Sequence, residues 1–502
     1  MTLSKDTLNN IKDTGVVAPD EKLFNLPEKV LQFGTGVLLR GLPDFFIDKA
    51  NKKGLFNGRV VVVKSTSKGG TAEFDAQDSL YTICVRGIEN GQPVQENIIS
   101  SAISRVLTAD QDWSAILELA ASPLLKVIVS NTTEVGIQLV EESISQYPPQ
   151  SFPAKLLAVL YARYKALGTS GDTEMAVIAT ELISDNGKKL EAIVLQLAKF
   201  NQLEDAFINW LGRSIHFCNS LVDRIVPGKP DAEALAKLET ELGYKDELII
   251  MAEPYRLWAI EGNEKVSELL GLEAADPGVI VRPDIEIFKE LKVRLLNGSH
   301  TLTSGIAYLL GIDTVTKAMN NALTRNYVNE LMMQEIVGAI PYEVVHDEAV
   351  AFANTVIDRF ANPSIQHLWI NITFQYTMKM KIRILPVLLH YYKLNAKVPA
   401  HIAFGFAAFL LFMKSARKEG NQYFGNYNGH EYAITDDEAA YFYEKDQQNE
   451  SEYVNLVLAD SQLWGTDLAA LPGFNETVKE NYNNILKYGM ADALTRLEET
   501  LH

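Results

Sequence analysis

A lysine, an amide and an imidazole with the chemistry to act on a carbonyl group lie close together in the segment 288–300. They are Lys292, Asn297 and His300. On an α-helix, which turns about 100° per residue, the three side chains fall within an arc of roughly 140°. A lysine that loses hydration there becomes a better acid near neutral pH, and an amide can donate to an oxygen that gains negative charge. The alternative is a surface helix on which Lys292 is solvated and His300 packs or caps.

A glycine-containing turn follows the apolar run 30–33. Gly34 and Gly36 let the backbone turn tightly and approach a pyrophosphate at the start of the next helix, where Arg40 would add a cation. The third glycine of the dinucleotide fingerprint is replaced by Leu39. The turn by itself is therefore weak evidence for dinucleotide binding, and an ordinary strand–helix turn is the alternative.

The segment 64–68 follows the second predicted strand and contains two lysines, three hydroxyl residues and no acid. An acid there would bind the ribose hydroxyl of NAD, whereas Lys64 and Lys68 would suit the 2′-phosphate of NADP. If the lysines point to solvent, the loop does not discriminate. From these residues alone the choice stays open.

The elements that must position these residues change in type along the chain. Helical patterns alternate with β-branched runs, which predict strands at 30–33, 60–63, 127–130, 177–180, 248–251 and 279–281. From Ile285 to His502 we find only helical periodicity. We therefore predict an α/β plus all-α protein, in which a Rossmann-type domain with a mostly parallel sheet, residues 1–283, precedes a helical domain, residues 284–502.

Asn131, Thr132 and Glu134 come directly after the predicted strand 127–130. Ligands bind at the carboxyl ends of parallel strands, so we expect these residues to line a nicotinamide pocket, with Glu134 in a proton path. A helix cap is the alternative for the two threonines at 132 and 133.

Composition excludes several classes of partner. The net charge is −18, the pI is near 5.0 and no run of lysines and arginines occurs, which argues against nucleic acid and anionic membranes. Cys84 and Cys218 are too few for a disulfide framework or a four-ligand zinc site, and we predict no metal. The apolar stretch 402–413 is too short to span a bilayer. We expect a cytoplasmic protein with a small-molecule substrate; the sequence does not indicate its oligomeric state.

Six motifs are spread over nearly the whole chain: 34–41, 77–82, 130–136, 185–187, 221–226 and the Lys292-x4-Asn297-Gly-x-His300 segment. Together they resemble the polyol-specific long-chain dehydrogenases, the mannitol dehydrogenase superfamily. The resemblance implies an NAD-dependent dehydrogenase that works without metal. It also implies roles: Lys292 is the general acid–base, Asn186 and Asn297 stabilise the oxyanion, and His300 contacts the reacting carbonyl or a neighbouring hydroxyl. Without the resemblance, Asn186 would be interpreted as a turn residue.

The segments 181–183, 217–224 and 379–386 resemble a branch of the superfamily that reduces keto sugar acids. Lys379 matches a substrate-binding lysine of the mannitol branch, but Asn371 replaces the arginine that this branch has eight positions earlier, which disfavours mannitol. Arg256 and Arg383 are candidates for binding a substrate carboxylate, because a guanidinium can do so bidentately. For each arginine a structural ion pair is the alternative.

Two other functions stay open from the sequence. One is a related reaction, on an epimeric keto sugar acid or on mannitol and fructose. The other is a dinucleotide-binding regulator without turnover. The set of Lys292, Asn297 and His300 argues against the regulator, because a sensor does not need a proton donor.

Overall fold

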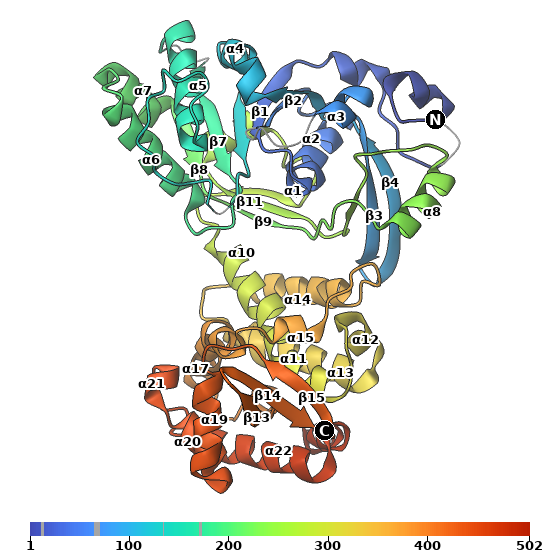
Figure 1. Ribbon diagram of the computed structural model, residues 1–502, viewed down its shortest axis with the longest axis vertical. Helices are drawn as coiled ribbons and strands as arrows, with labels where there is room; N and C mark the ends of the chain where they lie inside the picture. Colours follow the sequence, from blue (N-terminus) through green and yellow to red (C-terminus); the bar gives the residue numbers. More distant parts are fainter. Residues whose placement is uncertain (12–14, 65–70, 134, 170–172, 502) are drawn as a thin grey trace. The chain divides into compact units, whose positions relative to one another are not determined.

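The computed structural model describes residues 1–11, 15–64, 71–133, 135–169 and 173–501 (Figure 1). The chain forms two compact units. Unit 1 comprises Met1–Arg86 and Pro93–Ile285, and unit 2 comprises Gly87–Gln92 and Glu286–His502. Within the described ranges, no helix is long and apolar enough to cross a membrane.

Unit 1 is built on a six-stranded parallel sheet with the order β5-β2-β1-β6-β7-β8. The strands are β1 Glu28–Phe33, β2 Arg59–Lys64, β5 Ile103–Thr108, β6 Val127–Ser130, β7 Met175–Ala179 and β8 Ile215–Cys218. This is the strand order of the Rossmann fold, so the predicted fold class of the N-terminal part is confirmed. The order reverses between β1 and β6, and in such sheets ligands bind beyond the carboxyl ends of the strands at this point.

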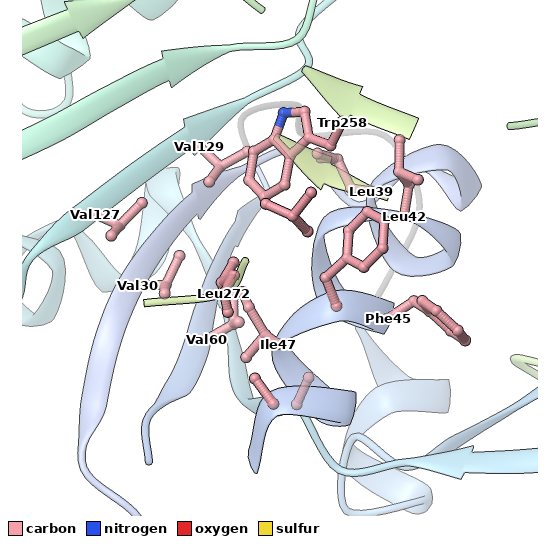
Figure 2. Packing of buried hydrophobic residues seen from close by; sticks show 14 of the residues in the cluster. Val30, Leu39, Leu42, Phe45, Ile47, Val60, Val127, Val129, Trp258 and Leu272 are labelled. Carbon is pink, nitrogen blue, oxygen red and sulfur yellow. The ribbon is translucent and has the colours of Figure 1, made fainter. Parts of the chain in front are cut away.

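The central strands are apolar on both faces because both faces are covered. Leu31 and Val61 point into a core shared with α4 Ala109–Ala120, α5 Phe152–Leu167 and α6 Asn186–Phe200. Val30 and Val60, one residue earlier in each strand, point the other way. Figure 2 shows them packed with residues of α1 Val37–Gly41 and α2 Pro43–Lys52 and with Trp258. This alternation fixes the strand register and thereby the positions of the loops that follow the strands.

All six predicted strands are present: four lie in the parallel sheet, and two are β10 Ile250–Ala252 and β12 Val279–Arg282. The structure also contains strands that were not predicted: β5 and β8, together with β3 Tyr81–Glu89, β4 Gln92–Ser100, β9 Ser220–Asp223 and β11 Leu257–Glu261. These strands mix polar and apolar residues. β3 and β4 join β10, and β9 and β11 join β12, in two three-stranded sheets. Short helices complete the unit: α3 Ala72–Ala76, α7 Asp205–Ser214, α8 Ala232–Leu242 and α9 Glu264–Leu270.

Unit 2 is mainly helical, as predicted. Its α-helices are α10 Glu286–Leu291, α11 Ser299–Leu309, α12 Val315–Asn320, α13 Ala322–Glu330, α14 His346–Phe360, α15 Trp369–Ile372, α16 Tyr376–Lys379, α17 Leu385–Leu394, α18 Ala400–Met413, α19 Ala439–Gln448, α20 Tyr453–Leu458, α21 Ser461–Trp464, α22 Phe474–Tyr488 and α23 Met490–Leu501. The apolar stretch at 402–413 forms nearly all of α18, and every residue from His401 to Met413 is buried. Its hydrophobicity thus reflects burial in the core of the unit.

The prediction that only helices follow Ile285 is wrong for one segment. β13 Ser415–Glu419, β14 Gln422–Tyr427 and β15 His430–Ile434 form an antiparallel sheet (Figure 1). Most of their residues are polar and more than half are exposed, so no apolar strand pattern marks them. The turn Asn428-Gly429, with positive φ at both residues, is a hairpin signal that the sequence does contain.

The helical segments of unit 2 are also less regular than predicted. The segment 313–338, which has a helical pattern in the sequence, is divided into α12, α13 and the π-helix η5 Leu331–Ile336. Two further π-helices occur, η4 Lys292–Gly298 and η7 Met380–Ile384. Hence the α-helical geometry assumed for the segment 288–300 is wrong, and the correction changes how the catalytic candidates face each other.

Candidate active site

The π-helix η4 places Lys292 and Asn297 on nearly the same side of the chain. Its i→i+5 hydrogen bonds bring residues five apart about one turn above each other. In an α-helix the same two residues would differ in direction by roughly 140°. The wider turn therefore aligns the lysine with the amide.

η4 packs closely against η7, and side chains satisfy carbonyl groups at this contact. Arg294 forms an ion pair with Glu290 at 2.9 Å and donates to the carbonyl oxygens of Ile382 and Arg383. A Cβ atom on Gly298 would lie 3.3 Å from the Ile384 side chain, so glycine permits the approach. The contact fixes the two π-helices, and the candidate residues they carry, to each other.

Asn297 has a free side-chain amide. Its backbone carbonyl accepts from Thr301 Oγ1 at 2.7 Å and from Arg383 Nη1 at 3.4 Å. Its side chain is partly buried and makes no hydrogen bond to any residue that the structure describes. The amide is therefore held in place through its backbone and keeps both N–H groups for a ligand.

His300 is held by aromatic rings. Its imidazole stacks on Phe360 with the ring centroids 3.8 Å apart and the planes within 1°. His367 and Trp369 contact it edge-on, at 5.2 and 5.7 Å. Nε2 of His300 is buried and has no hydrogen-bond partner in the described part of the chain. The ring is thus fixed in orientation while its polar atoms stay uncommitted.

The surroundings keep His300 neutral. Burial, followed by His367 and the nearby cations Arg359, Arg383 and Lys379, lowers the pKa of His300 well below its usual value. A neutral imidazole can donate from one nitrogen and accept at the other. His300 is therefore suited to bind a hydroxyl or a carbonyl oxygen.

Lys379 and Arg383 form a positive centre in which neither cation makes an ion pair with a described residue, although the charge of Asp436 acts on Lys379. Lys379 Nζ donates to the Ile372 carbonyl oxygen at 2.7 Å, and Arg383 donates to Thr301 Oγ1 at 3.0 Å. Within the described ranges, no carboxylate forms an ion pair with either cation. Burial, with a smaller effect of Arg383, lowers the pKa of Lys379 to about 8. Partly buried cations that make no ion pair are favourable sites for an anionic group.

In unit 1, the predicted glycine turn joins β1 to α1. Gly34 has a φ of +128°, and a Cβ atom there would lie 2.8 Å from the Asn131 carbonyl oxygen. A Cβ atom on Gly36 would have nothing within 4 Å. The first glycine is therefore required by the fold, whereas the second leaves open space beside the backbone.

The segment after β6 is fixed by a buried glutamate. Glu181, which follows β7, accepts from Ser130 Oγ at 3.1 Å, from the Thr132 backbone N–H at 2.9 Å and from Thr132 Oγ1 at 3.0 Å. Asn131 donates to Thr180 at 3.0 Å. Asn131 and Thr132 thus lie together at the carboxyl edge of β6 and β7, next to the reversal of strand order between β1 and β6.

A cavity of about 400 Å³ lies at this edge, lined by Leu38, Asn131, Thr133, Val135, Glu181 and Leu182. Val135 and Leu182 are strongly exposed for apolar side chains. An aromatic ring with a polar substituent would cover the apolar walls and meet the amide and the carboxylate. The residues at this edge therefore fit a nicotinamide group. Glu134 lies outside the described residues.

Asn186 lies in unit 1 at the start of α6 and is fully engaged. Its amide nitrogen donates to the carbonyl oxygens of Glu181 and Ser220, both at 3.0 Å. Its side-chain oxygen accepts from the backbone N–H groups of Gly187 and Ser220. The residue is 2% exposed. In this structure Asn186 braces the loops that follow β7 and β8.

Two predicted cationic ligands have structural partners. Arg256 forms an ion pair with Asp276 at 2.8 Å and donates to the Pro254 carbonyl oxygen, as the ion-pair alternative anticipated. Arg40 is buried, donates to the Leu248 carbonyl oxygen and lies over the Tyr81 ring. Neither guanidinium is arranged as an open anion site.

Of the two lysines that would suit NADP, the structure describes Lys64. Lys64 is buried at the end of β2, with 8% of its surface exposed. Lys68 lies outside the described residues. Two residues beside the candidate groups, His367 and Glu181, were not predicted as site residues, because no spacing rule in the sequence connects either of them to the site.

Comparison with known proteins identifies the family. Residues 28–274 match the mannitol dehydrogenase Rossmann domain, and residues 284–486 match the mannitol dehydrogenase C-terminal domain. The chain belongs to the mannitol dehydrogenase family. The resemblance expected from the sequence motifs is thereby confirmed.

Members of the family with curated names are similar over nearly the full chain. Altronate oxidoreductase of Halalkalibacterium halodurans is 37% identical over 487 residues, covering 94% of each chain. The Bacillus subtilis enzyme of the same name is 36% identical, covering 93% of this chain and 95% of its own. An Escherichia coli altronate oxidoreductase is also 36% identical, covering 94% and 97%.

Solved structures support the fold. One is Pseudomonas fluorescens mannitol 2-dehydrogenase in a ternary complex with NAD and D-mannitol, with a TM-score of 0.63 and 21% sequence identity. The match covers 99% of the present chain and 100% of the Pseudomonas chain. A substrate-free D-sorbitol dehydrogenase matches with a TM-score of 0.74 at 20% identity, covering 98% and 100%.

Proposed function

We propose that this member of the mannitol dehydrogenase family is an NAD-dependent oxidoreductase that reduces tagaturonate to altronate and catalyses the reverse reaction. One observation carries the choice of a sugar acid: Lys379 and Arg383 lie beside His300 and have no ion-pair partner among the described residues. A neutral polyol would leave both cations without an ion-pair partner. A uronate supplies a carboxylate, and the names of the relatives at 35–37% identity agree.

Lys292 is the proposed general acid–base. In the reducing direction its ammonium group gives a proton to the oxygen of the keto group, and in the oxidising direction its amine takes the proton from the hydroxyl. The free amide of Asn297, on the same side of η4, donates to that oxygen as negative charge develops. Asn186 is proposed as a second oxyanion donor, which requires it to exchange one of its present hydrogen bonds.

The neutral His300 orients the substrate. Its uncommitted nitrogens bind the reacting oxygen or the adjacent hydroxyl, and the stack on Phe360 holds the ring in one direction. Lys379 and Arg383 bind the carboxylate, Arg383 by two parallel hydrogen bonds. Binding at both ends of the substrate fixes which carbon is presented for reduction.

Unit 1 is proposed to hold the cofactor. Gly34, Gly36, Asn131 and Thr132 shape the edge of the sheet, and Arg40 supports the turn from within the core. Glu134 retains its proposed place near the nicotinamide. When bound, NADH supplies the hydride, while the protein supplies orientation and the proton.

We assign a different role to each part of the chain: residues 1–283 bind the dinucleotide, and residues 284–502 carry the catalytic and substrate-binding side chains. We also propose a cytoplasmic location. Cys84 and Cys218 are both free and buried, and a reducing compartment would keep them so.

A spectrophotometric screen tests the proposal. NADH and NADPH are each offered with tagaturonate, fructuronate and fructose, and cofactor oxidation is followed. We expect the highest kcat/KM with NADH and tagaturonate, and little effect of Lys64→Ala on the NADPH value. A preference for fructuronate or fructose would overturn the substrate assignment. A preference for NADPH that collapses in Lys64→Ala would overturn the cofactor assignment, and no oxidation with any pair would favour a non-catalytic regulator.

A further inference from the structure

Glu181 is a buried acidic residue that also lines a cavity. Its side chain is 2% exposed and lines the cavity at the carboxyl edge of β6 and β7. Three groups donate to it: the hydroxyls of Ser130 and Thr132 and the backbone N–H of Thr132. A side chain that accepts from three donors is suited to the carboxylate form.

No cation balances this carboxylate. Among the residues that the structure describes, no lysine, arginine or histidine forms an ion pair with Glu181. Another buried acid of the same unit, Asp276, is paired with Lys49 at 2.6 Å and with Arg256 at 2.8 Å. A buried charge without a counter-ion is costly, and a positive ligand group in the adjoining cavity would reduce that cost.

We propose that Glu181 is a positioning residue whose negative charge makes the cavity prefer the oxidised, cationic nicotinamide ring over the reduced, neutral one. The inference rests on the proposed use of NAD(H) by unit 1. It adds that the relative affinity for the two cofactor forms is set by one carboxylate. Glu181 would thereby shift the equilibrium between the bound cofactor forms without contacting the sugar acid.

The test measures binding, without turnover. Dissociation constants for NAD⁺ and NADH are determined by fluorescence titration for the wild type and for Glu181→Gln, which preserves size and removes charge. We expect the ratio Kd(NAD⁺)/Kd(NADH) to rise about tenfold, equivalent to about 1.4 kcal/mol. Glu181→Asp, which keeps the charge, should stay within about twofold of the wild-type ratio.

Glu142→Gln is the matched control. Glu142 is also a buried carboxylate of unit 1 and accepts from the backbone N–H groups of Gln150 and Ser151, but it does not line the cavity. Its substitution should leave the ratio unchanged. If Glu181→Gln does not fold, Leu182→Lys replaces it, because Leu182 lines the same cavity and is 65% exposed. The added positive charge should also raise the ratio.

The possible outcomes separate this inference from the proposed function. If both nucleotides bind and Glu181→Gln changes their affinities equally, the role of Glu181 is purely structural and the inference is overturned, while the proposed function stands. A ratio that Leu182→Lys leaves unchanged overturns it in the same way. If the wild type binds neither nucleotide, both proposals are overturned.

Discussion

The imidazole of His300 lies flat against the ring of Phe360, with the centroids 3.8 Å apart and the planes within 1°. His300 is on α11 and Phe360 is the last residue of α14, so the stack connects two helices that are distant in the sequence. Since no hydrogen bond from the described residues holds the imidazole, aromatic contacts determine its direction.

Phe360→Leu should therefore impair catalysis more than stability. Losing the stack removes about 0.5–1.5 kcal/mol of ring–ring interaction, and we expect kcat to fall up to about tenfold as His300 loses its fixed direction. Phe352→Leu, a buried substitution on the same helix, is the control and should lower Tm without lowering kcat. Equal kcat values in the two variants would show that the stack does not matter for turnover.

Lys292→Ala should abolish most of the turnover while NADH affinity stays nearly intact. A general acid–base contributes about 10²–10⁴-fold, because it transfers the proton in the transition state. Lys289→Ala removes an exposed lysine three residues earlier, which pairs with Glu286, and should have little effect. Stopped-flow turnover and NADH titration measure the two quantities. A Lys292→Ala enzyme with most of its kcat would remove this lysine from the mechanism.

Asn297→Ala and Asn186→Ala should differ in stability. Both should lower kcat more than they raise KM, since an oxyanion contact strengthens in the transition state. Only Asn186→Ala should also lower the free energy of unfolding, by about 2 kcal/mol or more, because it leaves buried backbone groups unpaired. Kinetics and urea unfolding test this. If Asn186→Ala is destabilised but its kcat is normal, Asn186 only braces the loops.

Substrate binding should weaken above about pH 8. The pKa of Lys379 is lowered to about 8, chiefly by burial, so the ammonium group is present below this pH and is lost above it. The KM for a sugar acid should rise through that range in the wild type. In Lys379→Met it should already be raised about tenfold at pH 7 and lack this step. Lys381→Met, two residues later on the π-helix η7, should behave as the wild type. A pH-independent KM in the wild type would argue against Lys379 as a ligand.

Asp44→Asn should stabilise unit 1 at alkaline pH. Asp44 is fully buried on α2; burial raises its pKa to about 7, although the hydrogen bond from Gln32 and the charge of Arg40 act against this. In an unfolded chain the group ionises near 3.9. Between these values the folded state binds more protons, so stability falls as pH rises, until the loss is complete above about pH 7.

An asparagine stays neutral and avoids this loss. The Tm difference between Asp44→Asn and the wild type should therefore grow from pH 5 to pH 8 by about 2 °C or more. Oδ1 of Asp44 and Oε1 of Gln32 both lack partners among the described residues. Asp44→Asn places an N–H donor beside Gln32, whose side chain already contacts that of Asp44. Asp110→Asn, at an exposed position, is the control. A constant Tm difference across this pH range would contradict the buried ionisation.

Local sequence patterns were sufficient to predict a strand wherever burial imposes a simple arrangement of apolar residues. The runs at 30–33, 60–63 and 127–130 predict central parallel strands, because a strand covered on both faces must be apolar throughout. The exposed hairpins β13–β15 could not be predicted in this way, since their stability comes from backbone pairing and leaves the side chains polar. The π-helix at Lys292 could not be predicted from the local pattern either. The segment η7, against which η4 packs, follows about 90 residues later in the sequence.

The same division holds for the candidate site. Sequence alone determined which residue types were available: a lysine, amides and an imidazole at fixed spacing, and glycines after the first strand. Tertiary structure decided which of them are uncommitted. It occupies Asn186, Arg40 and Arg256 with internal partners. Among the described residues it leaves the Asn297 amide without a hydrogen bond, and it gives the cations Lys379 and Arg383 hydrogen bonds to neutral oxygens but no ion pair. Whether a polar group is free depends on the atoms that surround it, and residues distant in the sequence supply most of those atoms.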